Sequence, residues 1–239
     1  RVLVYEAQLT IEDPTPPTGV VGGGEGWTAA GWVEGEVPVT VAGADAQGGI
    51  ARTRVYIDGE LVSELDRSGA CDWSMPTPCG NVAASTPVAH RIDTTRLADG
   101  EHEVAVAAVN AAGMETRVAR PTPLRVDNTA PAPPVALTAA RRGSSNVFDL
   151  TWQLPEDAGS PIEVAHWQLC APDCGPVRTT AVLTRLDGVE LPGRRDATLR
   201  VWLVDAQGHE NPEAAATVTL PYLAPPPPPA PPPPRPPAP

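Results

Sequence analysis

The stretch VPVTVAGADAQGGIARTRVYIDGELV, residues 37–62, decides the fold class of this chain. Apolar residues alternate along it with polar or small ones, first at Val37, Val39 and Val41; a second segment carries Thr53, Val55 and Ile57 on one face. A period of two residues is typical of a half-buried β-strand. The dipeptide Asp58-Gly59 then predicts a tight hairpin turn. The stretch therefore predicts short antiparallel strands rather than a helix.

The same pattern continues on both sides of a proline-rich linker. Residues 18–127 carry further strand signals at Val88–Ile92, Val104–Ala108 and Leu124–Val126. The linker is NTAPAPP, residues 128–134, and residues 135–222 alternate again at Phe148, Leu150 and Trp152 and at Leu199, Val201 and Leu203. Short strands with turn signals about every 8–12 residues are typical of β-sandwiches. We therefore expect an all-β protein made of two tandem β-sandwiches.

The two expected sandwiches repeat weakly in sequence. The stretch VAVAAVNAAG, residues 104–113, aligns with LRVWLVDAQG, residues 199–208, at an offset of 95 residues. A β-rich repeat of this length is typical of tandem modules.

The two ends of the chain lie outside these sandwiches. Residues 1–17 hold a strand pattern, Val2–Ile11, and a linker-like run, Asp13–Pro17. They represent either the last strand of an upstream domain or the first strand of the first sandwich. Thirteen of the 31 prolines fall between residues 221 and 239, so residues 223–239 are expected to form a disordered polyproline spacer. We interpret the chain as a monomeric segment of a longer protein.

Composition excludes several classes of function. The 239 residues include 17 arginines, no lysine and 29 acidic residues, which gives a net charge of −12. A nucleic-acid-binding protein shows a basic patch instead, and anionic lipid attracts basic segments. No apolar run approaches the roughly 18 residues of a membrane-spanning helix. The sequence therefore predicts no nucleic-acid partner and no membrane insertion of this segment.

The four cysteines fall in two close pairs. Cys71 and Cys79 bracket the loop CDWSMPTPC, and Cys170 and Cys174 bracket CAPDC. Zinc binding is the alternative, but seven and three residues separate the pairs rather than two, and neither loop contains histidine. We therefore expect two local disulfides. Disulfides indicate an oxidising compartment, which places the protein outside the cell or on its surface.

Two stretches of the first sandwich resemble bacterial immunoglobulin-like modules: residues 39–62 and the run IDTTRLADGEHEVAVAAVNAAG, residues 92–113, followed by LRVDNTAPAPP. The second sandwich resembles a fibronectin type III domain, through FDLTW at residues 148–152 and through residues 199–208. It departs from that family at Ala197, where a tyrosine is usual. The resemblance implies tandem immunoglobulin-like β-sandwiches from a secreted or surface protein of a high-GC bacterium. It also implies a non-catalytic role as spacer, adhesin stalk or binding accessory.

The sequence carries no recognisable catalytic motif, so we expect no enzymatic activity, no cofactor and no metal site. His90, His166 and His209 lie far apart, without a partner at metal or triad spacing. His102 is expected to face inward and to cap the first sandwich through a hydrogen bond to a nearby backbone group.

The tryptophans give the candidate binding residues. Strand register places Trp152 and Trp167 in the core, and it places Trp202 outward, beside His166 and Gln168 of a neighbouring strand. Trp73 lies in the first cysteine loop and is expected to be exposed. Exposed aromatic side chains serve as platforms for sugars or as anchors at protein interfaces. The alternative is that each tryptophan packs on a neighbouring loop or arginine stem.

Two functions remain open from the sequence. The first is a non-catalytic spacer and interaction (adhesion) module of a larger secreted or surface protein. The second is a carbohydrate-binding accessory region of a secreted glycoside hydrolase or lectin-like protein. The expected partners are a cell-wall or environmental polysaccharide, or a surface protein.

Overall fold

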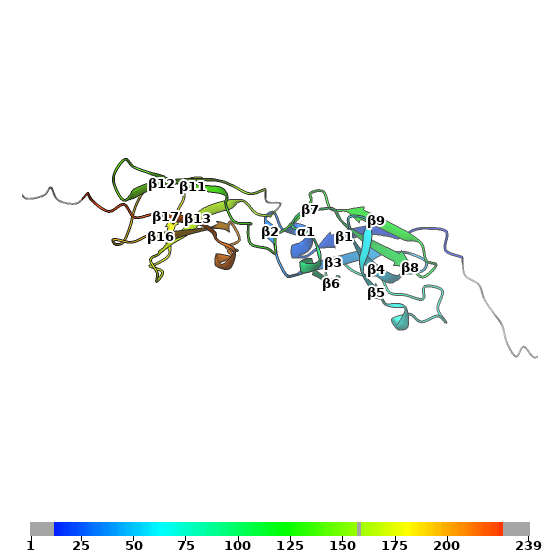
Figure 1. The fold of residues 1–239 in the computed structure, drawn as a ribbon. Helices are drawn as coiled ribbons and strands as arrows, with labels where there is room; N and C mark the ends of the chain where they lie inside the picture. Colours follow the sequence, from blue (N-terminus) through cyan, green and yellow to red (C-terminus); the bar gives the residue numbers. More distant parts are fainter. Residues whose placement is uncertain (1–11, 157–158, 227–239) are drawn as a thin grey trace, which may run out of the picture. The chain divides into compact units, whose positions relative to one another are not determined.

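A computed structural model describes residues 12–156 and 159–226 (Figure 1). Within them the chain forms two compact units. Of the described residues, 12–129 with 159–160 belong to the first unit, and 130–156 with 161–226 belong to the second. Strands account for almost all of the regular secondary structure in each unit, as the alternating sequence predicts. No helix in the described residues has the length and apolar character that a bilayer crossing requires.

The first unit is a sandwich of a three-stranded and a four-stranded sheet, with a small third sheet at one end. The three-stranded sheet has the order β1 (Thr18–Gly23), β3 (Glu36–Ala44), β6 (Val88–Asp93). The four-stranded sheet has the order β5 (Glu60–Asp66), β4 (Ile50–Ile57), β8 (Val104–Asn110), β9 (Glu115–Ala119). The small sheet has the order β2 (Trp32–Val33), β10 (Leu124–Val126), β7 (Gly100–His102). The unit also contains the short helix α1 (Glu25–Thr28) and the 3₁₀ turns η1 (Ser68–Ala70) and η2 (Thr94–Arg96).

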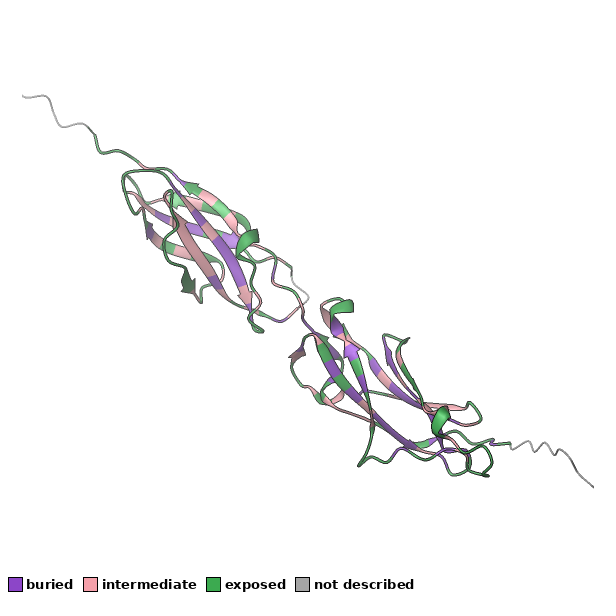
Figure 2. Cartoon of the chain, turned by 90° about the horizontal axis from the view of Figure 1, so that it is seen from below, coloured by how far each residue is buried: buried purple, intermediate pink, exposed green. Residues whose placement is uncertain are grey.

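The core of this unit lies between its sheets. The side chains that alternate in the sequence are its buried members: Val37, Val39, Val41, Thr53, Val55 and Ile57. Figure 2 shows buried and exposed segments alternating along the strands. Asp58 and Gly59 both have positive φ, 51° and 84°, which a two-residue hairpin of the expected type requires. The predicted strand register is therefore confirmed.

The second unit repeats this plan. One sheet has the order β11 (Val135–Arg141), β12 (Val147–Gln153), β15 (Arg185–Glu190). The other has the order β14 (Arg178–Thr180), β13 (Ile162–Cys170), β16 (Ala197–Asp205), β17 (Ala216–Leu220), and the 3₁₀ turn η3 (Pro212–Ala214) precedes β17. Its separate core contains Phe148, Leu150, Trp152, Leu199, Val201 and Leu203.

The sequence repeat corresponds to a structural one. β8 and β16 each take the third place in a four-stranded sheet of the same order. The turns that follow them are also alike, since Asn110 Oδ1 accepts from Met114 N at 2.8 Å and Asp205 Oδ1 accepts from His209 N at 2.9 Å. The glycines at the repeat positions, Gly113 and Gly208, have φ of 88° and 87°.

Residues 13–17 contact the first unit. Asn110 Nδ2 donates to Asp13 Oδ2 at 3.0 Å and to the carbonyl of Thr15 at 2.9 Å, and Thr116 Oγ1 donates to the carbonyl of Pro17 at 2.6 Å. The expected strand Val2–Ile11 and the tail from residue 227 onward lie outside the described residues.

Candidate functional site

The expectation of an exposed Trp202 is wrong. The strand register is as predicted, because Trp202 lies opposite His166 on β13 and outside the core cluster of its unit. Its side chain is nevertheless 3% exposed. The alternative, that this tryptophan packs on a neighbouring loop, is the one the structure shows. The segment that follows the turn after β16 packs back over the indole.

Glu210 makes the decisive contact with Trp202. Its Oε2 accepts from Trp202 Nε1 at 2.7 Å and lies 2.9 Å from His166 Nδ1. The His166 ring meets the indole edge-on, with centroids 5.7 Å apart. The hydrogen bond from Trp202, followed by the His166 contact, lowers the pKa of the Glu210 carboxyl against the opposing effect of burial. Trp202 is therefore held under a carboxylate that bonds both to its indole and to the His166 ring.

Gln168 is also occupied. Its Nε2 donates to the carbonyl of Gly175 at 2.8 Å, and its Oε1 accepts from Arg200 at 3.4 Å. Gly175 directly follows Cys174, so Gln168 holds the disulfide loop to β13. The predicted patch of Trp202, His166 and Gln168 is thus a packed polar cluster rather than an open aromatic platform.

Trp73 has the opposite environment, with 61% of its surface exposed. It lies in the loop between Cys71 and Cys79, which form a disulfide with Cα atoms 4.4 Å apart. The exposed Met75, at 53%, accompanies it in the same loop. This loop therefore presents two large apolar side chains to water.

Several contacts order the Trp73 loop. Asp72 Oδ1 accepts from Ser74 N at 3.0 Å and from Ser74 Oγ at 2.6 Å. These bonds form a turn that has Trp73 as its central residue. The hydrogen bond of Asp72 N to the carbonyl of Pro78, at 2.7 Å, closes the loop. At its base Cys79 is buried and donates its N–H to the carbonyl of Gly48. Trp73 is consequently exposed on a preorganised support.

The second predicted disulfide is also present, between Cys170 and Cys174 at the end of β13. The two remaining second-unit tryptophans with assigned roles lie at the core. Trp152 is 4% exposed and belongs to the core cluster. Trp167 is half-buried against that cluster, and the guanidinium of Arg178 lies 5.1 Å from its ring centroid.

His102 binds a backbone group at the end of the first unit. Its Nε2 lies 2.8 Å from the carbonyl oxygen of Ala98, and its Nδ1 lies 2.7 Å from Asp58 Oδ2. Burial on its own lowers the pKa of His102, but the hydrogen bonds to Asp58 and Ala98 outweigh it, so the pKa is raised. The hydrogen bonds from His102 and from the Glu103 amide likewise outweigh burial at Asp58 and lower its pKa.

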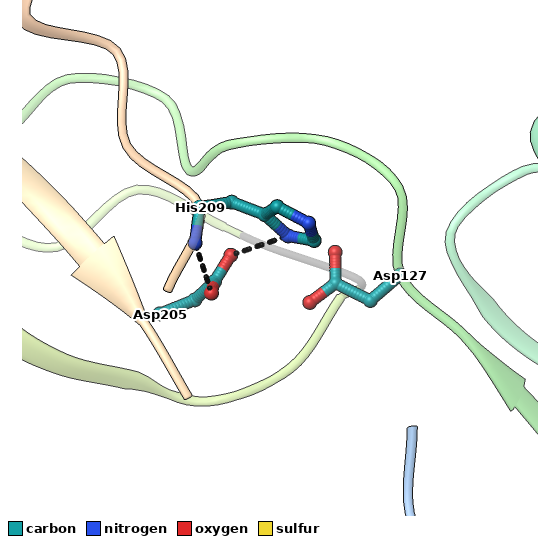
Figure 3. Close-up of side chains that lie close together, drawn as sticks. All are labelled: Asp127, Asp205 and His209. Atoms are coloured by element: carbon teal, nitrogen blue, oxygen red, sulfur yellow. Dashed lines mark hydrogen bonds and ion pairs between the residues drawn. The ribbon is translucent and has the colours of Figure 1, made fainter. Parts of the chain in front are cut away.

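The other histidines each have local partners. His90 is 1% exposed, and its two ring nitrogens lie 3.0 Å from Thr53 Oγ1 and 2.8 Å from Ser63 Oγ. Burial lowers its pKa and favours the neutral ring. His209 pairs with Asp205 within one turn, with Nδ1 3.3 Å from Oδ2 (Figure 3).

Sequence reasoning missed two residues that contact tryptophan rings: Glu210, which bonds to Trp202, and Arg178, whose guanidinium lies over the ring of Trp167. A signal for Glu210 was present, because it lies two residues beyond the turn glycine Gly208. A residue there pairs back onto the preceding strand, and Glu210 does so with Val204. No comparable signal identified Arg178, which reaches Trp167 across the β13–β14 pair.

No protein-family model and no curated protein sequence matches this chain. Domains A168–A170 of titin are similar in structure at 15% identity and a TM-score of 0.42, with 79% of this chain and 62% of the titin chain covered. This chain therefore spans less than two-thirds of that structure.

Two structures of fibronectin type III segments are also similar. The fibronectin(III)-like modules of Clostridium thermocellum CbhA share 11% identity at a TM-score of 0.31, with 82% of this chain and 92% of that chain covered. The two-domain fibronectin type III segment of chicken tenascin shares 14% identity at a TM-score of 0.35, with coverage of 87% and 99%.

Proposed function

We propose that this chain is a non-catalytic extracellular segment that acts as a spacer and interaction (adhesion) module of a larger secreted or cell-surface protein. The observation that carries the proposal is the exposed Trp73 on a disulfide-closed loop. Leaving an indole in water forgoes burial worth about 25 cal/mol for each Å². A loop that is ordered by a disulfide and a side-chain turn, yet keeps its indole exposed, is suited to contact a partner.

The two sandwiches suit the role of a scaffold that carries the loops. Each unit has its own apolar core, so each can hold its loops in place without the other. The two disulfides suit an oxidising compartment. Disulfide mapping of secreted protein under non-reducing conditions tests the location, and free thiols at all four cysteines would contradict it.

A carbohydrate is the second candidate partner, and the surroundings of Trp73 favour it. The loop that carries Trp73 also contains the carboxylate of Asp72 and the hydroxyls of Ser74 and Thr77. An aromatic face with hydrogen-bonding groups around it can stack on a sugar ring and bind its hydroxyls.

Affinity electrophoresis in soluble cell-wall and plant polysaccharides tests this candidate. Trp73→Ala is expected to abolish retardation, and Trp73→Tyr to preserve part of it. Met75→Ala is the matched control, because Met75 is exposed in the same loop but offers no ring. Binding to an immobilised surface protein that falls in both Trp73→Ala and Met75→Ala would favour the protein partner. No binding to either class of ligand by the intact chain would contradict both.

A further inference from the structure

A lateral groove opens along one side of the second unit. Its volume is about 520 Å³, and the apolar side chains of Trp167, Leu169, Leu186, Val189 and Leu191 line it. Trp167, Leu169, Leu186 and Leu191 are half-buried against the core cluster, so the groove reaches the edge of the core itself. Val177 and Val182, which precede and follow β14 in the sequence, are exposed.

The groove lies between two strands that each have one edge without a strand partner among residues 12–156 and 159–226. β15 pairs with β12 and is the last strand of its sheet, and β14 pairs with β13 and is the last strand of the other. All of β15 from Leu186 to Glu190 lines the groove. An unpaired strand edge beside an apolar channel is the arrangement to which an extended segment adds as a further strand, through main-chain hydrogen bonds and alternate side chains.

The chain contains a segment with the required pattern, residues 1–11, RVLVYEAQLTI, which lies outside the described residues. Tyr5, Ala7, Leu9 and Ile11 alternate with Glu6, Gln8 and Thr10, so one face of an extended segment is wholly apolar. Residues 5–11 extend about 23 Å at roughly 3.3 Å per residue, against about 20 Å for the six residues of β15. Both surfaces carry mixed charge, Arg178 and Glu190 in the groove and Arg1 and Glu6 in the segment.

The segment is attached to the first unit, whereas the groove belongs to the second. Asp13 accepts a hydrogen bond from Asn110 Nδ2, at the end of β8, so residues 1–11 are connected to the chain at that point of the first unit. Every copy of the chain carries a groove of its own, so the segment of one copy can meet the groove of another.

We propose that residues 1–11 of one copy of this chain dock as an added strand on β15, in the groove of the second unit of another copy. The contact joins two different surfaces, so it is heterologous and links copies head to tail. A single strand buries less than a standard interface, so the association is weak and depends on concentration. The proposal departs from the monomer that the sequence analysis expects, and it is independent of any ligand at Trp73.

The test compares the full chain with face-specific variants by sedimentation velocity over a concentration series. The wild-type chain is expected to self-associate, and deletion of residues 1–11 to remove the association. Leu9→Glu places a charge on the apolar face and is expected to weaken the association at least tenfold. Thr10→Glu is the matched control, because it places the same charge one residue away on the opposite face, and it is expected to retain association.

Hydrogen exchange locates the contact in the same samples. Amides of Leu186–Glu190 are expected to exchange more slowly in the concentrated full chain than in the chain without residues 1–11. A synthetic peptide of residues 1–12 is expected to compete with the association. The proposal is overturned if the full chain stays monomeric, if association survives the deletion, or if Leu9→Glu and Thr10→Glu have equal effects.

Discussion

Trp202 donates its indole N–H to Glu210, with Nε1 2.7 Å from Oε2. Through this bond the segment after the β16 turn covers a tryptophan that strand register turns away from the core. The same carboxylate oxygen contacts His166 on the adjacent strand. Trp202, although outward-facing by register, is thus buried and hydrogen-bonded, and it does not offer an open binding surface.

Replacing Glu210 with alanine is expected to expose Trp202. The substitution leaves the buried indole N–H without its acceptor, which costs about 1–3 kcal/mol. The measurements are chemical denaturation of the second unit and quenching of tryptophan fluorescence by acrylamide, which should increase. Glu213→Ala is the control, because Glu213 is exposed in the neighbouring 3₁₀ turn, and it should leave both readouts unchanged. Unaltered quenching in Glu210→Ala would show that the cover does not depend on this bond.

The His102–Asp58 pair is expected to stabilise the first unit mainly between about pH 4 and pH 6.5. The pKa of His102 is raised in the folded state, so its contribution is complete below the unfolded value of about 6.5 and is lost as pH rises through the folded pKa. The pKa of Asp58 is lowered, so its contribution is present above about 3.9 and is lost as pH falls through the folded pKa.

A double-mutant cycle with His102→Gln and Asp58→Asn measures this coupling. Asparagine tolerates the positive φ of residue 58, so the hairpin is preserved. We expect a coupling free energy of about 0.5–1 kcal/mol at pH 5 and a smaller one at pH 9, read from hydrogen exchange of β8 amides. Equal coupling at both pH values would refute an ionic contribution.

His90 is expected to show the opposite pH dependence in the same unit. Burial lowers the pKa of His90, so below about pH 6.5 the unfolded chain takes up a proton that the folded chain does not. The free energy of unfolding therefore decreases as pH decreases. His90→Gln removes this proton uptake. The destabilisation that it causes should therefore be larger at pH 8 than at pH 5, in contrast to His102→Gln. The same hydrogen-exchange experiment measures the destabilisation at both pH values. A larger destabilisation at pH 5 than at pH 8 would contradict the prediction.

The strands could be predicted from the sequence because one face of each is buried. At Val37, Val39 and Val41 a shift by one residue would expose every buried side chain, so the register follows from alternation alone. The Asp58-Gly59 hairpin and the matching turns after Asn110 and Asp205 could also be predicted from the sequence. Their residue types are those that tolerate the required backbone angles.

The environment of the outward-facing side chains could not be predicted in the same way. Alternation separates the two faces of a sheet, but it does not say which loop covers the outer face. Trp202 and Trp73 both lie off the core by sequence pattern, yet one is 3% and the other 61% exposed. The difference depends on Glu210 folding back in one case and on a closed disulfide loop in the other, and both are contacts between side chains and loops rather than properties of a strand.

Removing the Cys71–Cys79 disulfide is expected to destabilise the first unit by about 2–3 kcal/mol, through the greater freedom of the unfolded loop. The double Cys71→Ser, Cys79→Ser variant should also increase the mobility of Trp73, measured by fluorescence anisotropy decay. Cys170→Ser with Cys174→Ser is the comparison, because its bridge encloses a shorter loop in the other unit and should leave Trp73 unaffected. An unchanged anisotropy decay in the first variant would show that the side-chain turn alone orders the loop.

Gly49 is expected to tolerate no side chain, because two independent constraints meet there. Its φ is +67°, and a Cβ on it would overlap the backbone carbonyl of the buried Cys79. Gly59 provides the matched control, since its φ is +84° but a Cβ there meets nothing within 4 Å. Gly59→Ala should therefore cost only the backbone strain, about 1 kcal/mol, whereas Gly49→Ala should cost at least twice as much and displace the base of the Trp73 loop. Denaturation of both variants, together with acrylamide quenching of Trp73, measures the difference, and equal destabilisation would mean that the loop moves away from Gly49 without cost.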